Sequence, residues 1–168
     1  MEWGELYKFI AKEISNGKVI GWYHSNIEFG ARALGHRSIL ADPTSPIMKD
    51  RINKLIKRRE GFRPFAPMVA EEYHAKFFNW VDDVPYMNQV VEVRGEYRDK
   101  LKSVTHIDGT ARVQTVYKDN ITYPLLLEFE KITGFPILLN TSFNIKDKTI
   151  VLTPDDAIET FFNTDIDI

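Results

Sequence analysis

Four stretches of the chain have apolar residues at helical spacing, and each has a recognisable start or stop. The first predicted helix ends at Gly17 and has an apolar face made of Trp3, Leu6, Tyr7, Ile10 and Ile14. A second is expected from a cap at Ser45 to about Lys57, with a face made of Met48, Ile52, Leu55 and Ile56. The third runs between Thr122 and Gly134, with inward residues Leu125, Leu126, Phe129 and Ile132. The last begins with a capping box at Thr153 and carries Ile158, Phe161 and Phe162.

Short β-rich runs lie between these helices. Strands are expected at residues 19–23, 38–41, 68–70, 88–93, 111–117 and 136–139. The last of these is apolar enough to be buried on both faces of a sheet. A short helix is expected near residues 72–78, and residues 96–102 form a loop or a short helix. Because strands and helices mix without a regular βαβ repeat, the predicted fold class is α/β or α+β with a twisted mixed sheet.

Composition narrows the class of protein further. With 168 residues, 43 % of them hydrophobic, the chain is expected to form one domain over residues 1–168. Its 22 basic and 24 acidic residues give a net charge of −2, which favours neither a nucleic-acid nor a membrane partner. The absence of cysteine excludes disulfides, zinc–thiolate sites and thiol nucleophiles, and no apolar stretch has the length of a membrane span. We therefore expect a cytoplasmic protein.

Arginine and glycine gather in residues 29–38. Arg32 and Arg37 lie five residues apart in an expected loop with two glycines. Arginine matches the oxygens of a phosphate or a carboxylate with two parallel hydrogen bonds, which lysine cannot do. The segment alone leaves two interpretations open, a phosphate site or surface ion pairs with acidic residues.

A second candidate lies in residues 57–67. Arg63 stands between Phe62 and the pair Pro64 and Phe65, so we expect it to be partly buried and to need an anionic partner. That partner is either a protein carboxylate or a ligand phosphate. The basic residues of the preceding helix favour a solvated helix face; they are Lys49, Arg51 and Lys54.

Two further polar clusters adjoin expected strands. Residues 106–112 include Arg112, and residues 140–144 include Asn140, Ser142 and Asn144. Polar clusters that follow buried strands are where α/β sheets place ligands, although residues 140–144 could also be a turn that bonds its own backbone. The four histidines lack metal-ligand spacing, so no metal bound by this chain is predicted. The motifs of P-loop ATPases and serine hydrolases are also missing from the sequence.

Taken together and in this order, the segments resemble the C-terminal domain of the NodU and CmcH carbamoyltransferase family. The resemblance covers nearly the whole chain, and the matching residues are 29–43, 57, 59–60, 62–67, 111–114, 139–144 and 164–167. The chain departs from the family pattern at Thr44, where arginine is common. It departs again at Asp147 and Lys148, where a Gly-Glu pair is usual.

The resemblance implies a YrdC-like fold, in which a twisted mixed sheet and its flanking helices surround a basic cavity. It places the phosphate and nucleotide contacts on Arg32, Arg37, Lys57, Arg63, Arg112, Asn140, Ser142 and Asn144. Among these residues, it implies a catalytic role for Lys57, Arg63 and Arg112.

The resemblance also implies an activity, the formation of a carbamoyl-adenylate from carbamoyl phosphate and ATP, with Mg²⁺ accompanying the nucleotide. A larger N-terminal domain, actin-like and carrying a His-ligated iron, would then pass the carbamoyl group to an acceptor hydroxyl. The resemblance places that domain outside this chain. It is the expected protein partner, and we also consider a homodimer.

Two rival interpretations are weighed against this one. YrdC-like domains also make threonylcarbamoyl-adenylate, but the Lys/Arg-Thr-x-Arg signature of that family is not found in this sequence. A stand-alone nucleotide sensor or RNA-binding module is the non-enzymatic alternative. The balanced charge and the lack of stacking aromatic residues beside the basic run speak against RNA.

Overall fold

The computed structural model describes residues 2–80 and 82–168. Its centre is a five-stranded sheet in the order β1-β2-β7-β3-β6, in which only β3 and β6 are parallel neighbours. The strands are β1 (Ile20–Tyr23), β2 (Arg37–Ala41), β7 (Ile137–Ser142), β3 (Ala66–Ala70) and β6 (Gln114–Val116). This mixed sheet with flanking helices confirms the expected fold class.

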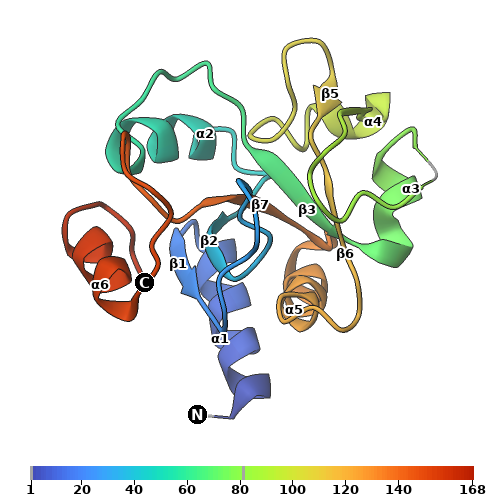
Figure 1. The fold of residues 1–168 in the computed structure, drawn as a ribbon. Helices are drawn as coiled ribbons and strands as arrows, with labels where there is room; N and C mark the ends of the chain where they lie inside the picture. The colour runs from blue at the N-terminus through green and yellow to red at the C-terminus, as the bar shows by residue number, and fades with distance from the viewer. Residues whose placement is uncertain (1, 81) are drawn as a thin grey trace.

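Two helices cover one face of the sheet, α1 (Trp3–Ser15) and α5 (Tyr123–Thr133). Successive strand residues point to opposite faces, so alternate positions such as Leu40 and Leu138 pack against these helices. The helices contact one another as well, as Figure 1 shows below the sheet. α1 ends where the sequence predicts, and Tyr7, Ile10 and Ile14 of its predicted apolar face are buried, whereas Trp3 is 54 % exposed.

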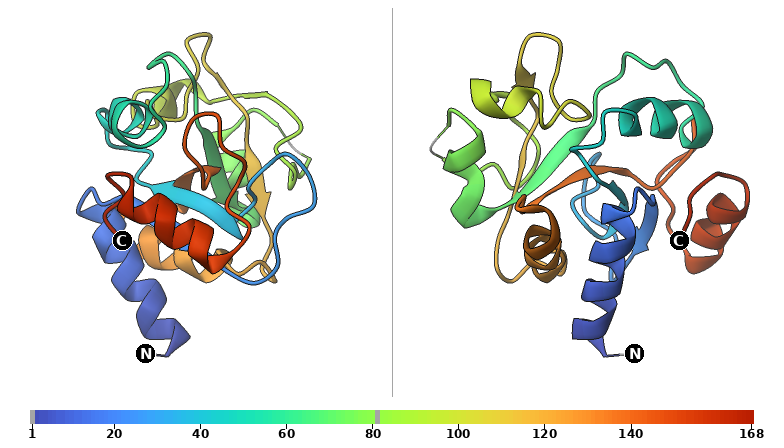
Figure 2. Two further views of the ribbon diagram at one scale, coloured as in Figure 1. Left: turned by 60° about the vertical axis from the view of Figure 1, so that its left-hand side comes forward. Right: turned by 180° about the vertical axis from the view of Figure 1, so that it is seen from behind.

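The other face is covered by shorter elements. The intervening strand residues, among them Ile39 and Leu139, pack against α2 and the segment that follows β3. Figure 2 shows from two further sides how these pieces surround the sheet. The elements are α2 (Met48–Arg51), a π-helical turn (Ile52–Ile56), a 3-10 turn (Glu71–Tyr73), α3 (His74–Phe77), β4 (Val91–Glu92), α4 (Gly95–Arg98), β5 (Thr110–Ala111) and α6 (Pro154–Phe162).

Several local predictions can be compared with this architecture. The capping box at Thr153 is confirmed, because its side chain accepts from the Asp156 backbone N–H and the Asp156 carboxylate accepts in return. The apolar faces were predicted too broadly: five residues expected to pack are exposed, namely Trp3, Leu55, Ile132, Ile158 and Phe162. β7 is longer than expected because it continues through Asn140 to Ser142. The first residues of the polar cluster, Asn140 to Ser142, therefore belong to β7, so the cluster is not a turn over its whole length.

Candidate anion-binding site

The sheet topology brings several distant segments to one end of β7. Because β2 and β3 are antiparallel to β7, their first residues lie beside its last ones: Ser38 pairs with Ser142, and Ala66 pairs with Asn140. β6 runs parallel to β3 and therefore begins at the same end of the sheet. The loops that enter β2, β3 and β6 must meet there, and they carry Arg32, Arg59 and Arg112.

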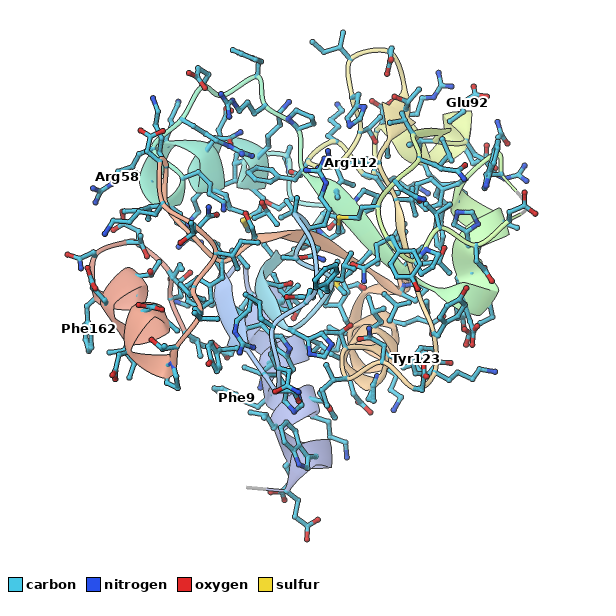
Figure 3. All side chains as sticks on the ribbon, in the orientation of Figure 1. Phe9, Arg58, Glu92, Arg112, Tyr123 and Phe162 are labelled. Atoms are coloured by element: carbon cyan, nitrogen blue, oxygen red, sulfur yellow. The ribbon has the colours of Figure 1, made fainter. Side chains whose placement is uncertain are left out.

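A small cavity of about 100 Å³, which we call the arginine cavity, lies where these loops meet. Its basic residues are Arg32, Arg59 and Arg112, and its polar residues on β7 are Asn140, Thr141 and Ser142. Figure 3 shows Arg112 near the middle of the molecule, between α2 and β5. The cavity therefore unites four of the predicted contact residues, Arg32, Arg112, Asn140 and Ser142.

Arg112 is partly buried, and its guanidinium is repelled by the nearby positive charge of Arg32. Burial lowers the pKa of its guanidinium, and the nearby Arg32 lowers it further. The Nε atom of Arg112 is buried and has no hydrogen-bond partner within residues 2–80 and 82–168. A buried donor without a partner costs free energy in the absence of a ligand, so this atom is poised to donate to an anion.

Arg59 is a cavity residue that was not among the predicted contacts. Its Nε donates to the Asn53 side-chain oxygen at 2.7 Å, and its guanidinium lies 4.9 Å from the centre of the Phe65 ring. Burial lowers the pKa of Arg59, and Arg63 lowers it further. A weak signal was present, because Arg59 belongs to the segment that resembles the family. Its neighbours Lys57 and Arg58 gave it the appearance of a solvated basic run.

A hydrogen-bonded pair of amides forms one wall of the cavity. The Nδ2 atom of Asn140 donates to the Gln114 side-chain oxygen at 2.8 Å and to the Ala33 carbonyl at 3.0 Å. Gln114 in turn donates to the Leu34 carbonyl at 2.9 Å. These bonds fasten the loop that carries Arg32 onto β7 and β6, and they fix the side chains because both amides are almost fully buried.

Lys57 lies beneath the end of β7 and does not line the arginine cavity. Lys57 follows the π-helical turn directly, and only 3 % of it is exposed. Its Nζ donates to the Ser142 carbonyl, to the Asn144 side-chain oxygen at 2.6 Å and to the Asn144 carbonyl at 3.0 Å. Burial lowers the pKa of Lys57 to about 7, with Arg59 as a further cause. Lys57 thus holds together the turn that contains two predicted contacts, Ser142 and Asn144.

Two further predicted contacts, Arg63 and Arg37, do not line the arginine cavity. The expectation that Arg63 is partly buried is wrong: its side chain is 52 % exposed and pairs with Glu60 at 3.0 Å, because Phe62 points outward and gives no cover. The partner within the chain is therefore the carboxylate, one of the two alternatives that the sequence left open. Arg37 is buried over the Tyr23 ring and donates to the carbonyls of His24, Ser25 and His36. Its guanidinium braces the loop before β2.

Together, the fold and the cavity define an α/β domain with an arginine-lined cavity at one end of its central sheet. The family model of the carbamoyltransferase C-terminus matches residues 11–168, and the chain belongs to that family. It is 52 % identical to nodulation protein NolNO of Sinorhizobium fredii over an alignment of 162 residues, which covers 94 % of this chain and 24 % of that protein. It is 51 % identical to NolO of Bradyrhizobium diazoefficiens over 159 residues, 92 % of this chain and 29 % of that protein. The chain thus spans about a quarter of the length of these relatives.

Solved structures share the fold at low sequence identity. Full-length HypF in its phosphate- and nucleotide-bound form matches with a TM-score of 0.68 and 19 % identity, over 95 % of this chain and 24 % of that one. A Sua5 variant from P. abyssi matches with a TM-score of 0.62 and 14 % identity, over 95 % of this chain and 44 % of that one. These matches confirm the expected YrdC-like fold. None of the helices that the structure describes is long and apolar enough to cross a membrane.

Proposed function

We propose that this chain is the carbamoyl-activating domain of an O-carbamoyltransferase, which binds carbamoyl phosphate and ATP in and around the arginine cavity. The observation that carries the proposal is the cavity itself. Arg32, Arg59 and Arg112 line it together, and none of them makes an ion pair in the described part of the chain. Both substrates are polyanions, which is the class of ligand that several fixed guanidinium groups bind best.

The reaction follows from the two substrates. Water removes the phosphoryl group of carbamoyl phosphate, which gives carbamate and inorganic phosphate. A carbamate oxygen then attacks the α-phosphorus of ATP, the P–O bond to the β-phosphate breaks, and pyrophosphate leaves. The products are carbamoyl-adenylate and pyrophosphate, so no side-chain nucleophile is needed. The catalytic contribution of the chain is to position the substrates and to stabilise negative charge on the non-bridging phosphate oxygens.

The site residues have different roles in this proposal. Arg32, Arg59 and Arg112 donate to phosphate oxygens, and Ser142 and Asn140 line the opposite wall. Arg63 is next to this site and would exchange the carboxylate of Glu60 for a ligand phosphate. Mg²⁺ would be held by the phosphates of the nucleotide, since none of the described residues that line the cavity is acidic.

The second half of the reaction requires more protein than this chain contains. The relatives are about three and a half to four times as long as the matched region, which leaves room for a further domain that presents the acceptor. In the proposed division, this chain activates the carbamoyl group and an N-terminal domain transfers it to an acceptor hydroxyl. We expect pyrophosphate release by this chain to require carbamoyl phosphate, and acceptor carbamoylation to require the N-terminal domain. Mass spectrometry that finds a carbamoylated acceptor with this chain alone would contradict the division.

Titration calorimetry with pyrophosphate and with carbamoyl phosphate tests the anion site. Arg112→Ala should weaken both ligands about tenfold or more, because charge-assisted hydrogen bonds contribute about 1.5 to 3 kcal/mol each. Arg58→Ala is the matched control: Arg58 adjoins Arg59 in sequence but donates to the Asn163 carbonyl at 2.9 Å, far to the left of Arg112 in Figure 3. Equal affinities in the wild type and in Arg112→Ala would refute the assignment.

A further inference from the structure

Asn140 lies in the wall of the arginine cavity, and both hydrogens of its amino group are already used. The Nδ2 atom donates to the Gln114 side-chain oxygen at 2.8 Å and to the Ala33 carbonyl at 3.0 Å. Only 1 % of Asn140 is exposed, so its neighbours hold the side chain in place. Asn140 therefore has no N–H group left to offer to a phosphate oxygen.

The neighbouring carbonyls fix which end of this amide is the nitrogen. If oxygen and nitrogen were exchanged, the Asn140 oxygen would face the Ala33 carbonyl, and two acceptors would oppose each other. Gln114 is fixed in the same way, because its nitrogen donates to the Leu34 carbonyl at 2.9 Å and its oxygen accepts from Asn140. The polar side-chain atom that remains to Asn140 is Oδ1, which can only accept.

The Asn140 Oδ1 atom is buried and accepts from no group in the described part of the chain. A buried acceptor without a donor costs free energy, which the N–H group of a ligand can recover. The same cavity contains the converse, since the buried Nε of Arg112 has no acceptor among the described residues. The arginine cavity thus combines one unsatisfied acceptor with one unsatisfied donor.

These two atoms require a ligand that is more than a phosphate. A phosphate dianion has only acceptors, so it can satisfy Arg112 but leaves the Oδ1 atom of Asn140 without a donor. A carbamoyl group has a carbonyl oxygen beside an amino group, which are the required acceptor and donor. Drug-sized ligands occupy pockets of about 300 to 1,000 Å³, so the cavity, at about 100 Å³, suits a small group of this kind.

We propose that Asn140 is a specificity-determining residue, whose Oδ1 accepts a hydrogen bond from the amino group of carbamoyl phosphate. The arginines bind the phosphate, and Asn140 distinguishes the carbamoyl group from acyl groups that have no N–H. Gln114 and the Ala33 carbonyl act through Asn140, because they keep its oxygen directed at the ligand. This inference rests on the proposed function, and it adds the residue that selects carbamoyl phosphate over an acyl phosphate.

Two stable phosphonates that differ in one group test the proposal. Phosphonoacetamide has the amide of carbamoyl phosphate, and acetonylphosphonate has a methyl group in place of the amino group. In titration calorimetry the wild type should bind phosphonoacetamide at least about tenfold more tightly, because the methyl group of the other ligand leaves Oδ1 unsatisfied. Equal affinities in the wild type would overturn the proposal, whether or not any variant folds.

The ratio of the two dissociation constants separates recognition by Asn140 from a general loosening of the loop. In Asn140→Leu, whose side chain has a similar size and no acceptor, the ratio should fall to about one. Arg112→Ala should weaken both phosphonates alike and keep the wild-type ratio, since both ligands carry the same phosphonate and carbonyl oxygens. Arg58→Ala is the matched control outside the cavity and should change neither affinity. A wild-type ratio in Asn140→Leu would contradict the assignment.

Pyrophosphate distinguishes a failure of this inference from a failure of the proposed function. If the wild type binds pyrophosphate and also binds the two phosphonates equally, the anion site stands and Asn140 does not select the carbamoyl group. If the wild type binds none of the three ligands, the proposed function fails, and this inference fails with it.

Discussion

Replacing Asn53 by alanine removes the side chain that holds Arg59 at the arginine cavity. Asn53 is fully buried in the π-helical turn, and its side-chain oxygen accepts from the Nε of Arg59 at 2.7 Å. Its Nδ2 donates to the Arg63 carbonyl at 3.0 Å and to the Gly61 carbonyl at 3.3 Å. One amide thus fixes both the cation and the loop that leads from it into β3.

The magnitude follows from these three bonds. A hydrogen bond to a charged group contributes about 1.5 to 3 kcal/mol and a neutral one about 0.5 to 1.5 kcal/mol. The longest of the three is weak, and water can replace part of the loss in an exposed loop. We therefore expect Asn53→Ala to lower the free energy of unfolding by roughly 2 to 4 kcal/mol. Pyrophosphate affinity should fall by about tenfold, because Arg59 is no longer oriented.

A double-variant cycle separates positioning from general destabilisation. If Asn53 acts on the ligand through Arg59, then Asn53→Ala combined with Arg59→Ala should bind pyrophosphate no more weakly than Arg59→Ala alone. Denaturant unfolding and calorimetry on the same samples provide both quantities. Additive losses of affinity, or normal pyrophosphate binding by Asn53→Ala, would refute the reasoning.

Two further predictions concern stability. Because burial lowers the pKa of Lys57 to about 7, the unfolded chain, with a normal lysine pKa, binds more protons between about pH 7 and 10. The free energy of unfolding of the wild type should therefore increase as the pH rises through this range. Lys57→Met should lack that increase in denaturant titrations. If the wild type and Lys57→Met show parallel profiles of stability against pH, the surrounding oxygens keep Lys57 charged and the prediction is wrong. Gly35 and Gly30 both have positive φ, but a Cβ atom at Gly35 would lie 2.9 Å from the Thr122 side chain, whereas nothing is within 4 Å at Gly30. Thermal unfolding should thus show Gly35→Ala to be less stable than Gly30→Ala by about 1 to 3 kcal/mol, and equal losses would argue against this packing.

The long elements could be predicted from the sequence because their signals are local. The apolar spacing and Gly17 predict α1, and the capping box at Thr153 predicts the start of α6. The extent of β7 was missed because Asn140 and Ser142 are polar, and their burial depends on neighbouring strands that are distant in sequence. The two-residue strands β4 and β5 have too few residues for any periodicity to show.

The candidate site was predicted in part. Arg32 and Arg112 were identified by the family resemblance, and their convergence depends on the strand order, which no local pattern reveals. The adjacent side chains of Arg58 and Arg59 also point to different parts of the molecule, which the sequence does not indicate. Arg58 adopts a φ of 50°, so the chain turns there; Arg58 reaches the Asn163 carbonyl, whereas Arg59 faces the cavity. Backbone conformation therefore decides which of these two adjacent arginines lines the cavity.

The cavity arginines make the unliganded fold less stable than it could be. Arg112 is partly buried and close to Arg32, and its Nε has no partner among the residues that the structure describes, whereas Arg51 pairs with Asp167 at 2.7 Å. We expect Arg112→Gln to raise the free energy of unfolding by about 1 kcal/mol, and Arg51→Gln to lower it, when no anion is present. With saturating pyrophosphate, the wild type should become more stable than Arg112→Gln, since only the wild type gains the full binding free energy. Thermal unfolding with and without pyrophosphate measures both effects. A loss of stability in Arg112→Gln without ligand would show that the arginine is a structural residue, and the cavity would then no longer be a site kept charged for an anion.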